Sequence, residues 1–236
     1  MFVVNAQEMR EIDRFTIREV GVPAEVLMEN AGAAAAREIF ARYPEGKVAV
    51  VLGGSGNNGG DGWGVARGLH LRGWRVFPFL LGKEERLSPE SRIHWNALKN
   101  LGTPPLLLQE GEETGWLHLE RSLQQADVVV DALIGVGLEK QVRPSAARAI
   151  EAVNRASAWV VSLDIPSGVN ADDGQVMGAA IRADLTVTFG YPKRGHYLFP
   201  GAELRGELVV ADISLAAPQH PPQGRLFGLR EAARLP

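Results

Sequence analysis

The apolar positions along the chain predict an alternation of buried strands and amphipathic helices. The apolar runs are continuous and not alternating, which is typical of parallel strands that are buried on both faces. Strands are predicted at 47–52, 74–81, 105–108, 127–132, 158–164 and 184–190, and helices near 62–72, 88–100, 116–124 and 143–156. This order predicts right-handed crossovers and an α/β fold, a Rossmann-like, doubly wound, mostly parallel sheet with helices on both faces in three αβα layers.

Two helices are expected before this alternation. Asn5, followed three residues later by Glu8, is a capping signal for a helix that extends to about Glu19. Pro23 stands where a second helix should begin. The middle of this second helix, Ala31 to Ala36, consists of small residues. Such a face packs closely either on the sheet of its own chain or on a second copy, and since twofold dimers are the commonest oligomers we expect a homodimer.

The C-terminal end of the pattern predicts an edge strand and then a tail. The segment 205–214 predicts the edge strand, and its pattern allows an antiparallel orientation. Residues after 215 are rich in Pro and Gln, which is typical of a linker. The chain is therefore expected to form one domain over 1–215, followed by a linker or tail over 216–236.

Composition narrows the class of protein. The 236 residues carry a net charge of −3 and their Lys and Arg residues are scattered, so no basic surface for nucleic acid is expected. There is no cysteine, which excludes disulfides and thiolate metal sites. No apolar run approaches the ~18 residues that would span a membrane, and the N-terminus lacks the apolar core of a signal peptide. We therefore expect a soluble protein of the cytoplasm.

The stretch Gly53–Gly62 is the most informative local feature. It connects a predicted strand to a predicted helix, and it contains a G-x-G-x-x-G pattern. Glycines allow positive φ angles and close approach of a ligand, and the N–H groups of a helix N-terminus attract anions. However, Asn57, Asn58 and Asp61 occupy the same turn, and a carboxylate there would repel a pyrophosphate unless a cation or another ligand orientation compensates. The alternative is a tight turn with Asp61 as a helix cap.

Two further strand ends carry polar residues. Asp131 ends one strand before Gly135 and Gly137, and Asp164 ends another strand before Pro166-Ser-Gly. Because ligands bind at the carboxyl ends of strands in open α/β sheets, these acids are expected to converge with Asp61 on one crevice. Carboxylates that lie so close raise one another's pKa or recruit a cation. The alternatives are a loop cap for Asp131 and an Asx-type turn for Asp164.

The remaining candidate residues give weaker signals. Lys193 lies in the segment Gly190-Tyr-Pro-Lys-Arg-Gly195, and the sequence favours neither a surface role nor a functional role for it. The five histidines show no spacing typical of metal ligands, and we expect them to be structural or exposed.

Three motifs in this order resemble those of one known family. They are GNNGGDG at Gly56–Gly62, VDALIGVG at Val130–Gly137 and DIPSG at Asp164–Gly168, and the segment Thr186–Lys193 agrees as well. They resemble the NAD(P)H-hydrate epimerase family, the YjeF N-terminal domain. The resemblance covers about residues 3–215.

The resemblance implies an isomerase of metabolite repair, which interconverts the R and S forms of hydrated NADH and NADPH. It implies a substrate site formed by Asn57, Asn58, Gly59, Gly60, Asp61, Gly135, Val136, Gly137, Leu138, Glu139, Lys140, Gln141 and Asp164. It also implies one monovalent cation, K⁺, held by Asn58, Asp131 and Ser167. We interpret Asp164 as the general acid and base of the reaction, with Lys193 as a second proton-transfer group.

The tail adds a possible functional partner to this interpretation. The segment Leu226–Pro236 resembles the connector that leads into an ADP- or ATP-dependent dehydratase in bifunctional relatives. The chain is then either a standalone epimerase with a residual tail or the epimerase half of a longer protein.

Two other functions remain open at this point. A nicotinamide-dependent oxidoreductase would carry an acid ~20 residues beyond the glycine loop. In this chain the second predicted strand ends in the segment Phe79-Leu-Leu-Gly-Lys83, and the acids near this end are Glu84 and Glu85. A non-catalytic binding or scaffold protein on the same fold is the second alternative, and the joint presence of the polar motif residues argues against it.

Overall fold

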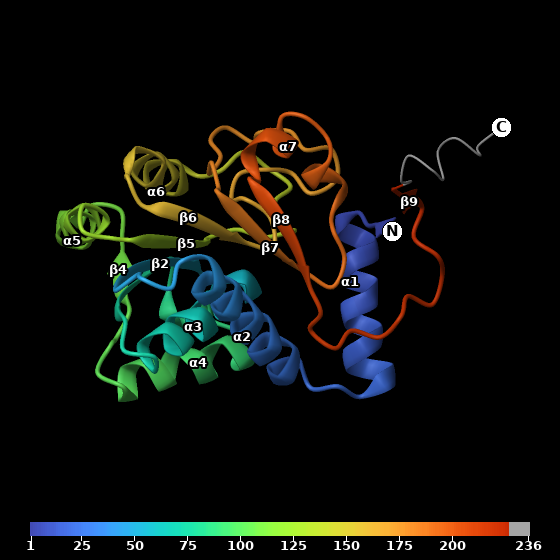
Figure 1. The fold of residues 1–236 in the computed structure, drawn as a ribbon, viewed down its shortest axis with the longest axis horizontal. Helices are drawn as coiled ribbons and strands as arrows, with labels where there is room; N and C mark the ends of the chain where they lie inside the picture. Colours follow the sequence, from blue (N-terminus) through green and yellow to red (C-terminus); the bar gives the residue numbers. More distant parts are fainter. Residues whose placement is uncertain (227–236) are drawn as a thin grey trace.

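A seven-stranded parallel sheet forms the centre of the protein (Figure 1). The computed structural model describes residues 1–226. The strands in spatial order are β4 (Leu106–Leu108), β3 (Arg75–Leu81), β2 (Val48–Gly54), β5 (Val128–Ala132), β6 (Trp159–Leu163), β7 (Leu185–Phe189) and β8 (Glu207–Ala211). Each lies within the corresponding predicted range or extends two residues beyond it, which confirms the predicted α/β fold.

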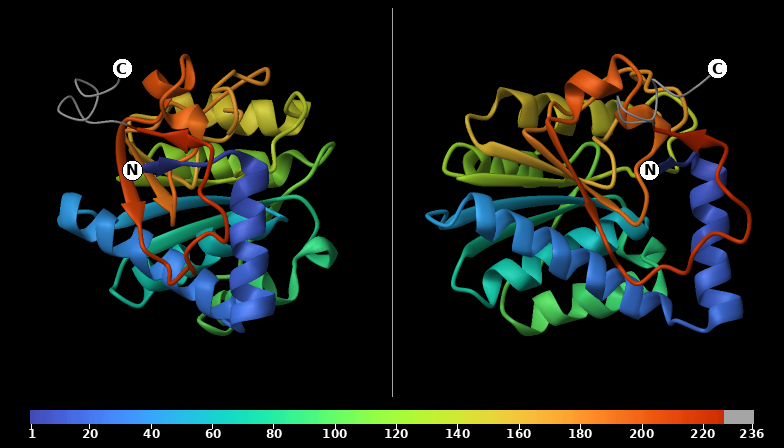
Figure 2. Two further views of the ribbon diagram at one scale, coloured as in Figure 1. Left: turned by 90° about the vertical axis from the view of Figure 1, so that its right-hand side faces the viewer. Right: turned by 45° about the vertical axis from the view of Figure 1, so that its right-hand side comes forward.

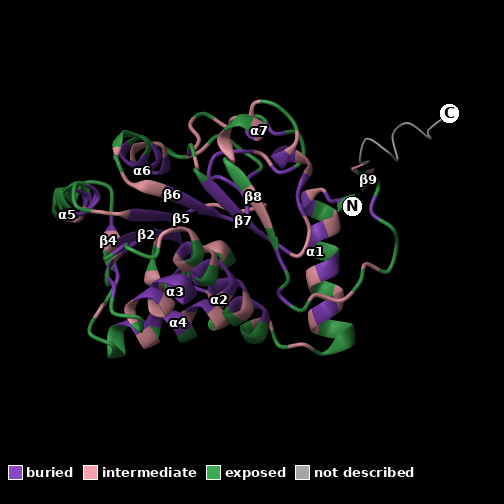
Figure 3. Cartoon of the chain, viewed as in Figure 1, coloured by how far each residue is buried: buried purple, intermediate pink, exposed green. Residues whose placement is uncertain are grey.

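Helices cover both faces of this sheet in three layers (Figures 1 and 2). One face carries α2 (Ala24–Arg42), α3 (Asn57–His70) and α4 (Pro89–Asn100), and the other carries α5 (Glu113–Leu123) and α6 (Pro144–Arg155). The central strands are buried between the two layers (Figure 3), so that the sheet separates two apolar clusters. Because both faces of these strands are buried, both need apolar side chains, and this explains the continuous apolar runs in the sequence.

The edge strand β8 is parallel, whereas the sequence pattern allowed an antiparallel orientation. β8 pairs with β7 in parallel, with Leu185 opposite Glu207 and Phe189 opposite Ala211. Between the two strands the chain returns across the sheet through the 3₁₀ turn Arg194–His196 and the short helix α7 (Gly201–Leu204). This connection is long enough to return the chain to the edge of the sheet where β7 begins, so β8 runs parallel to β7. The prediction of an antiparallel strand is therefore wrong.

The strand order reverses beside β2, and the loops that follow β2, β5 and β6 lie near this position. The chain goes from β2 outward to β3 and β4, then returns to place β5 on the other side of β2. Leu52 lies opposite Asp131, and Asp131 lies opposite Ser162, so the carboxyl ends of β2, β5 and β6 are aligned. In open sheets, ligand crevices form at such a switch point.

The small residues of α2 are buried inside the chain. Ala31, Ala34, Ala35 and Ala36 are buried, and a Cβ atom on Gly32 would lie 2.9 Å from the Cα of Gly64 in α3. The two helices thus approach each other backbone to backbone. The face that suggested self-association is used within one chain, so it gives no support to a homodimer, and the oligomeric state stays a prediction.

The helix α1 (Ala6–Phe15) stands outside the three layers, across the carboxyl edge of the sheet (Figure 2). Asn5 and Glu8 form the predicted capping box at its start. A short π-helix, Thr16–Val20, continues it. Residues 216–225 run back alongside α1, where Ala216 N–H donates to Thr16 Oγ1 and Gln223 N–H donates to Glu8 Oε1.

The tail pairs with the N-terminus at its far end. The two-residue strand β9 (Gly224–Arg225) pairs with β1 (Phe2–Val3) in an antiparallel ladder. The predicted division into a domain and a linker stays a prediction. The rest of the segment that resembles a connector, 227–236, lies outside the described residues.

The close contact of α2 and α3 leads to a prediction about stability. Gly32→Ala should lower the free energy of unfolding by about 1–3 kcal/mol, because the added methyl group meets the α3 backbone. In a helix without this neighbour, the same change would stabilise by about 1 kcal/mol. Urea unfolding measures the difference, and Arg37→Ala, at an exposed position of α2, is the control. A Gly32→Ala protein that is as stable as the parent would contradict the packing argument.

Candidate active site

A cavity of about 550 Å³ lies at the carboxyl edge of the sheet, between the strand ends and α1. Its polar wall includes residues from four separate parts of the chain. These are Asp13 of α1, Asn57, Asn58 and Asp61 of the glycine-rich stretch, Asp164 after β6, and Lys193. Gly135, Val136 and Gly137, which follow β5, complete this wall. The fold thus brings two of the three predicted acids, Asp61 and Asp164, into one cavity.

The glycine-rich stretch is helical earlier than the sequence predicts. Helix α3 begins at Asn57, after Gly56, and Gly56 makes no side-chain cap. None of the glycines from 53 to 62 has a positive φ angle. A Cβ atom on Gly59 would lie 1.9 Å from the Gly54 carbonyl oxygen, and one on Gly62 would lie 2.6 Å from the Ala132 Cβ. These glycines therefore allow α3 to approach β2 and β5, and Asp61 is not the helix cap.

Asp164 and Lys193 form a buried ion pair at the centre of the polar wall. Lys193 is fully buried, and its ammonium group donates to Asp164 Oδ1, to Thr188 Oγ1 at 2.8 Å and to the Phe189 carbonyl at 3.2 Å. These contacts use the three protons of the group. The other carboxylate oxygen, Asp164 Oδ2, faces Gly135, where a Cβ atom would lie 3.2 Å from it. One oxygen of Asp164 is therefore held by the protein and the other faces the cavity wall.

His196 holds the backbone of both partners in place. Lys193 N–H donates to His196 Nδ1 at 3.0 Å, and His196 Nε2 lies 2.9 Å from the Asp164 carbonyl oxygen. Burial and the nearby Lys193 charge lower the pKa of His196 to about 3. The ring is therefore neutral, with its proton on Nε2. The sequence expectation of a structural histidine is confirmed for this residue, which supports an Asp164 backbone at a φ of 65°.

Asp131 and Ser167 form a buried network behind the cavity and do not line it. Asp131 Oδ2 accepts from Ser162 Oγ at 2.8 Å and from Ser167 N at 2.9 Å. Asp131 Oδ1 accepts from Ser167 Oγ at 2.5 Å and from Leu133 N at 3.3 Å. Burial nevertheless raises the pKa of Asp131 above its ordinary value, because it outweighs these hydrogen bonds.

The side-chain amide of Asn58, in the polar wall, has no hydrogen-bond partner among the residues described. Both its amide oxygen and its amide nitrogen are buried without a hydrogen-bond partner in the part of the chain that the structure describes. An unpaired buried amide costs about 1–3 kcal/mol. Within residues 1–226, no cluster of His, Cys, Asp or Glu has the arrangement of a metal site. A bound ligand that hydrogen bonds to this amide would remove the cost.

The pKa values of two carboxyl groups of the cavity are raised by their surroundings. Burial, and secondarily the charges of Asp164 and Asp13, raise the pKa of Asp61 well above its ordinary value. Burial also raises the pKa of Asp13 to about 6, against the opposing charge of Lys193. Sequence reasoning missed Asp13. Its signal was an acid placed four residues after Met9 and four before Ile17, on the apolar face of an amphipathic helix.

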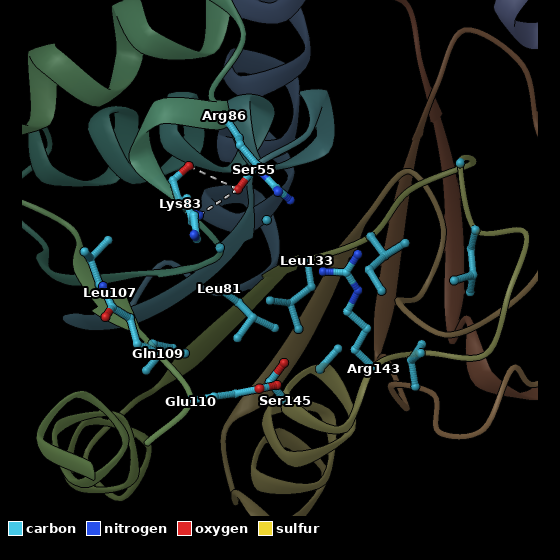
Figure 4. A pocket seen from close by; sticks show the side chains of 18 of the residues that line it. Ser55, Leu81, Lys83, Arg86, Leu107, Gln109, Glu110, Leu133, Arg143 and Ser145 are labelled. Atoms are coloured by element: carbon cyan, nitrogen blue, oxygen red, sulfur yellow. Dashed lines mark hydrogen bonds between the residues drawn. The ribbon is translucent and has the colours of Figure 1, made fainter. Parts of the chain in front are cut away.

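A second, larger cavity of about 1270 Å³ adjoins the first (Figure 4). The two share Leu133, Ile134 and Gly137. The predicted substrate residues Leu138, Glu139, Lys140 and Gln141 line only this second cavity. Figure 4 shows Ser55 on its wall, where Lys83 N–H donates to Ser55 Oγ at 3.1 Å. Gly59 and Gly60 line neither cavity, and they are packing positions of α3.

Comparison with known protein families matches the part of the chain that contains the three motifs. Residues 24–195 match the family described as YjeF-related protein N-terminus. The chain belongs to this family. The crystal structure of yeast ynu0 superposes with a TM-score of 0.73 at 27% identity, over 84% of each chain. The fold and the family are therefore shown by independent comparisons.

Two curated relatives differ in how much of them this chain covers. The "Bifunctional NAD(P)H-hydrate repair enzyme Nnr" of Thermofilum pendens is 42% identical over 214 residues, which are 91% of this chain and 40% of that protein. The "NAD(P)H-hydrate epimerase" of Limosilactobacillus fermentum is 38% identical over 213 residues, 89% of this chain and 95% of that protein. The chain thus spans under half of the bifunctional relative. In residues 1–226, no helix is long and apolar enough to cross a membrane.

The neutral, buried His196 leads to a prediction about pH. Its pKa is about 3 in the folded chain, compared with an ordinary value of 6.5. Between these values the unfolded chain binds a proton that the folded chain does not, so this residue lowers stability as the pH falls from about 6.5 towards 3. In His196→Asn, the free energy of unfolding should change less over this range than in the parent. The exposed-site variant His118→Asn should keep the parental slope, and equal slopes in all three proteins would refute the assignment.

Proposed function

We propose that this protein is an NAD(P)H-hydrate epimerase, which interconverts the R and S forms of hydrated NADH and NADPH. The observation that carries the proposal is the Asp164–Lys193 ion pair, with its second carboxylate oxygen facing the cavity side. The names of the relatives in the same family support it. Removing damaged cofactor is metabolite repair, and since these cofactors are used inside cells we place the protein in the cytoplasm.

The two adjoining cavities suggest how a dinucleotide would lie. We place the hydrated nicotinamide ring in the smaller cavity, against Asp164 and the Asn57–Asp61 turn. The chain of the substrate would pass Gly137, which both cavities share, so that its other nucleotide enters the larger cavity along 138–141. A dinucleotide needs an extended site of this kind, since a single ring pocket would leave half of the ligand exposed.

The chemistry of the substrate requires a proton donor and a proton acceptor. Carbon C6 of the hydrated ring bears both nitrogen and hydroxyl, so the nitrogen lone pair assists the loss of the hydroxyl once that oxygen is protonated. Return of water to the other face of the ring inverts the centre. Asp164 is suited to exchange protons with the oxygen bound to this carbon, because a carboxylate that lines the ligand cavity can serve as general acid or base.

Lys193 acts on Asp164 and not on the substrate in this proposal. Its three ammonium protons are all donated within the protein, and its side chain is buried. The ammonium group contacts Oδ1 and fixes the orientation of the carboxylate. We therefore assign Lys193 a positioning role and leave proton transfer to carboxyl groups.

A monovalent cation fits the polar residues beside the cavity. Asn58 offers an unpaired amide oxygen, and Asp131 and Ser167 offer one carboxylate and one hydroxyl. One charge with neutral oxygens suits K⁺ better than a divalent ion, which usually takes more carboxylate. The ion would supply positive charge near the substrate. Asp131 and Ser167 are already hydrogen bonded to each other, so they would share their oxygens with the ion.

A dehydratase is the expected partner reaction. Relatives named as bifunctional repair enzymes are longer than this chain, which covers 40% and 42% of two of them. An epimerase alone restores no NADH, because it only exchanges the two epimers. We propose that it supplies the S form to an ADP- or ATP-dependent dehydratase, either fused or separate.

The first functional test uses a mixture of both epimers with an S-specific dehydratase. Adding the protein should lead to complete consumption of the mixture, whereas a non-catalytic scaffold would leave the R fraction. Asp164→Asn should lower kcat by about 10²–10⁴-fold, because the amide cannot exchange the proton. Binding of NADH should change only a few-fold. Glu151→Gln, an exposed site on α6, is the control, and full activity in Asp164→Asn would rule out the assigned role.

The cation leads to a separate prediction. Replacing K⁺ with Li⁺ in the assay should lower the activity of the parent protein, since the smaller ion contracts the ligand shell. Asn58→Ala should abolish the difference between the two salts. Titration of each salt at constant ionic strength measures this. Identical rates of the parent protein in both salts would exclude a K⁺ requirement.

A further inference from the structure

Asp13 is the one carboxylate of the cavity that α1 contributes. Met9, Asp13 and Ile17 all line the cavity, and they are spaced four residues apart along the continuous helix formed by α1 and the π-helix. Among the described residues, the carboxylate of Asp13 has no hydrogen-bond or ion-pair partner, although its backbone carbonyl accepts from Thr16 N–H. Packing does not account for a carboxylate at this position.

The chain fixes α1 next to the segment that carries Lys193. Val4 forms a parallel bridge with Lys193, in which Val4 N–H donates to the Pro192 carbonyl at 2.9 Å and Arg194 N–H donates to the Val4 carbonyl at 3.0 Å. Ala6 N–H at the start of α1 donates to Asp172 Oδ1 at 2.6 Å. The helix is therefore held at a set position relative to the Asp164–Lys193 pair. Asp13 and Asp164 reach the same cavity from two different elements, α1 and the loop after β6.

We propose that Asp13 is a second catalytic carboxyl group, which exchanges protons on one face of the hydrated ring while Asp164 serves the other. This inference rests on the proposed epimerase function and assigns a role to a residue outside the recognised motifs. Inversion at C6 requires that water leaves one face of the ring and returns to the other, and two carboxyl groups from separate elements allow one proton exchange with oxygen on each face.

The step balances in atoms and charge. The Asp13 carboxyl donates its proton to the C6 hydroxyl, the C–O bond breaks, and water leaves as the ring nitrogen lone pair forms a C=N bond. A water molecule on the opposite face then bonds to C6, its extra proton passes to the Asp164 carboxylate, and the C=N electrons return to nitrogen. The reverse reaction moves the proton from Asp164 to Asp13. The two residues therefore share one exchangeable proton.

The charges around Asp13 suit this exchange. Asp164 follows β6, Asp61 is on α3, Lys193 precedes the 3₁₀ turn, and Arg10 of α1 and Glu90 of α4 also line the cavity. Burial raises the pKa of Asp13, the Lys193 charge lowers it, and the Asp164 charge raises it, to about 6. A carboxyl group with a pKa near the operating pH is the most effective for proton transfer.

The test compares Asp13→Asn with the parent in the epimerase assay. We expect kcat to fall by about 10²-fold or more, with KM within a few-fold. Because the equilibrium between the epimers does not depend on pH, both directions should share one pH profile, whose alkaline limb near pH 6 disappears in Asp13→Asn. In ¹⁸O-labelled water, product formed by the parent should carry solvent oxygen. Glu11→Gln, an exposed acid on the same helix, should behave as the parent.

Several results would overturn the proposal. These are parental kcat in Asp13→Asn, a limb near pH 6 that survives the change, or retention of the original oxygen by the parent protein. A loss of kcat with an unchanged pH profile would indicate a structural role and would also overturn it. If the parent itself fails to epimerise the substrate, the proposed function fails. An active parent with a fully active Asp13→Asn refutes only the role of Asp13.

Discussion

The buried ion pair between Lys193 and Asp164 is the interaction on which the site depends. A lysine that is fully buried loses its hydration, and this loss costs several kcal/mol unless hydrogen bonds and an opposite charge replace it. Here a carboxylate, a hydroxyl and a carbonyl replace the water. Removing any one of them would leave a buried charge with an unmet proton. The pair is therefore expected to tolerate little change in the strands β6 and β7 that present it.

Backbone geometry supports this pair at a cost. Asp164 adopts a φ of 65°, which is unfavourable for a residue with a side chain. The neutral His196 accepts the Lys193 N–H and contacts the Asp164 carbonyl. It thus ties together two segments separated by about 30 residues in sequence. The strain is localised where the cavity begins, which is where strained residues are commonly found in enzymes.

The sheet could be predicted from the sequence because burial on both faces leaves continuous apolar runs. The positions of Asp61 and Asp164 followed from the rule that parallel strands end at a common edge. The role of the glycines did not follow, since Gly59 and Gly62 serve contacts to β2 and β5 that depend on tertiary structure. The same limit applies to Asp131, whose partners come from the neighbouring strand and turn.

Two other features needed the structure for a different reason. The orientation of β8 depends on how far the connection after β7 travels, and residue patterns do not encode this path. Asp13 lies on a helix outside the sheet, so the rule that ligands bind at the carboxyl ends of parallel strands does not predict its position. The proposed dinucleotide path across the two cavities likewise depends on the arrangement of loops after β2, β3 and β5.

The attachment of α1 has a consequence for how the protein folds. The N-terminal ammonium group donates to the Leu226 carbonyl, a contact that spans 225 positions in sequence. Gln223 and Ala216 reach α1 from nearly as far. Contacts at such separations form late, because a long loop must close before they give any stabilisation. During synthesis the sheet and the contacts of Val4 and Ala6 can therefore form first, and the contacts of residues 216–226 complete the attachment of this helical segment last.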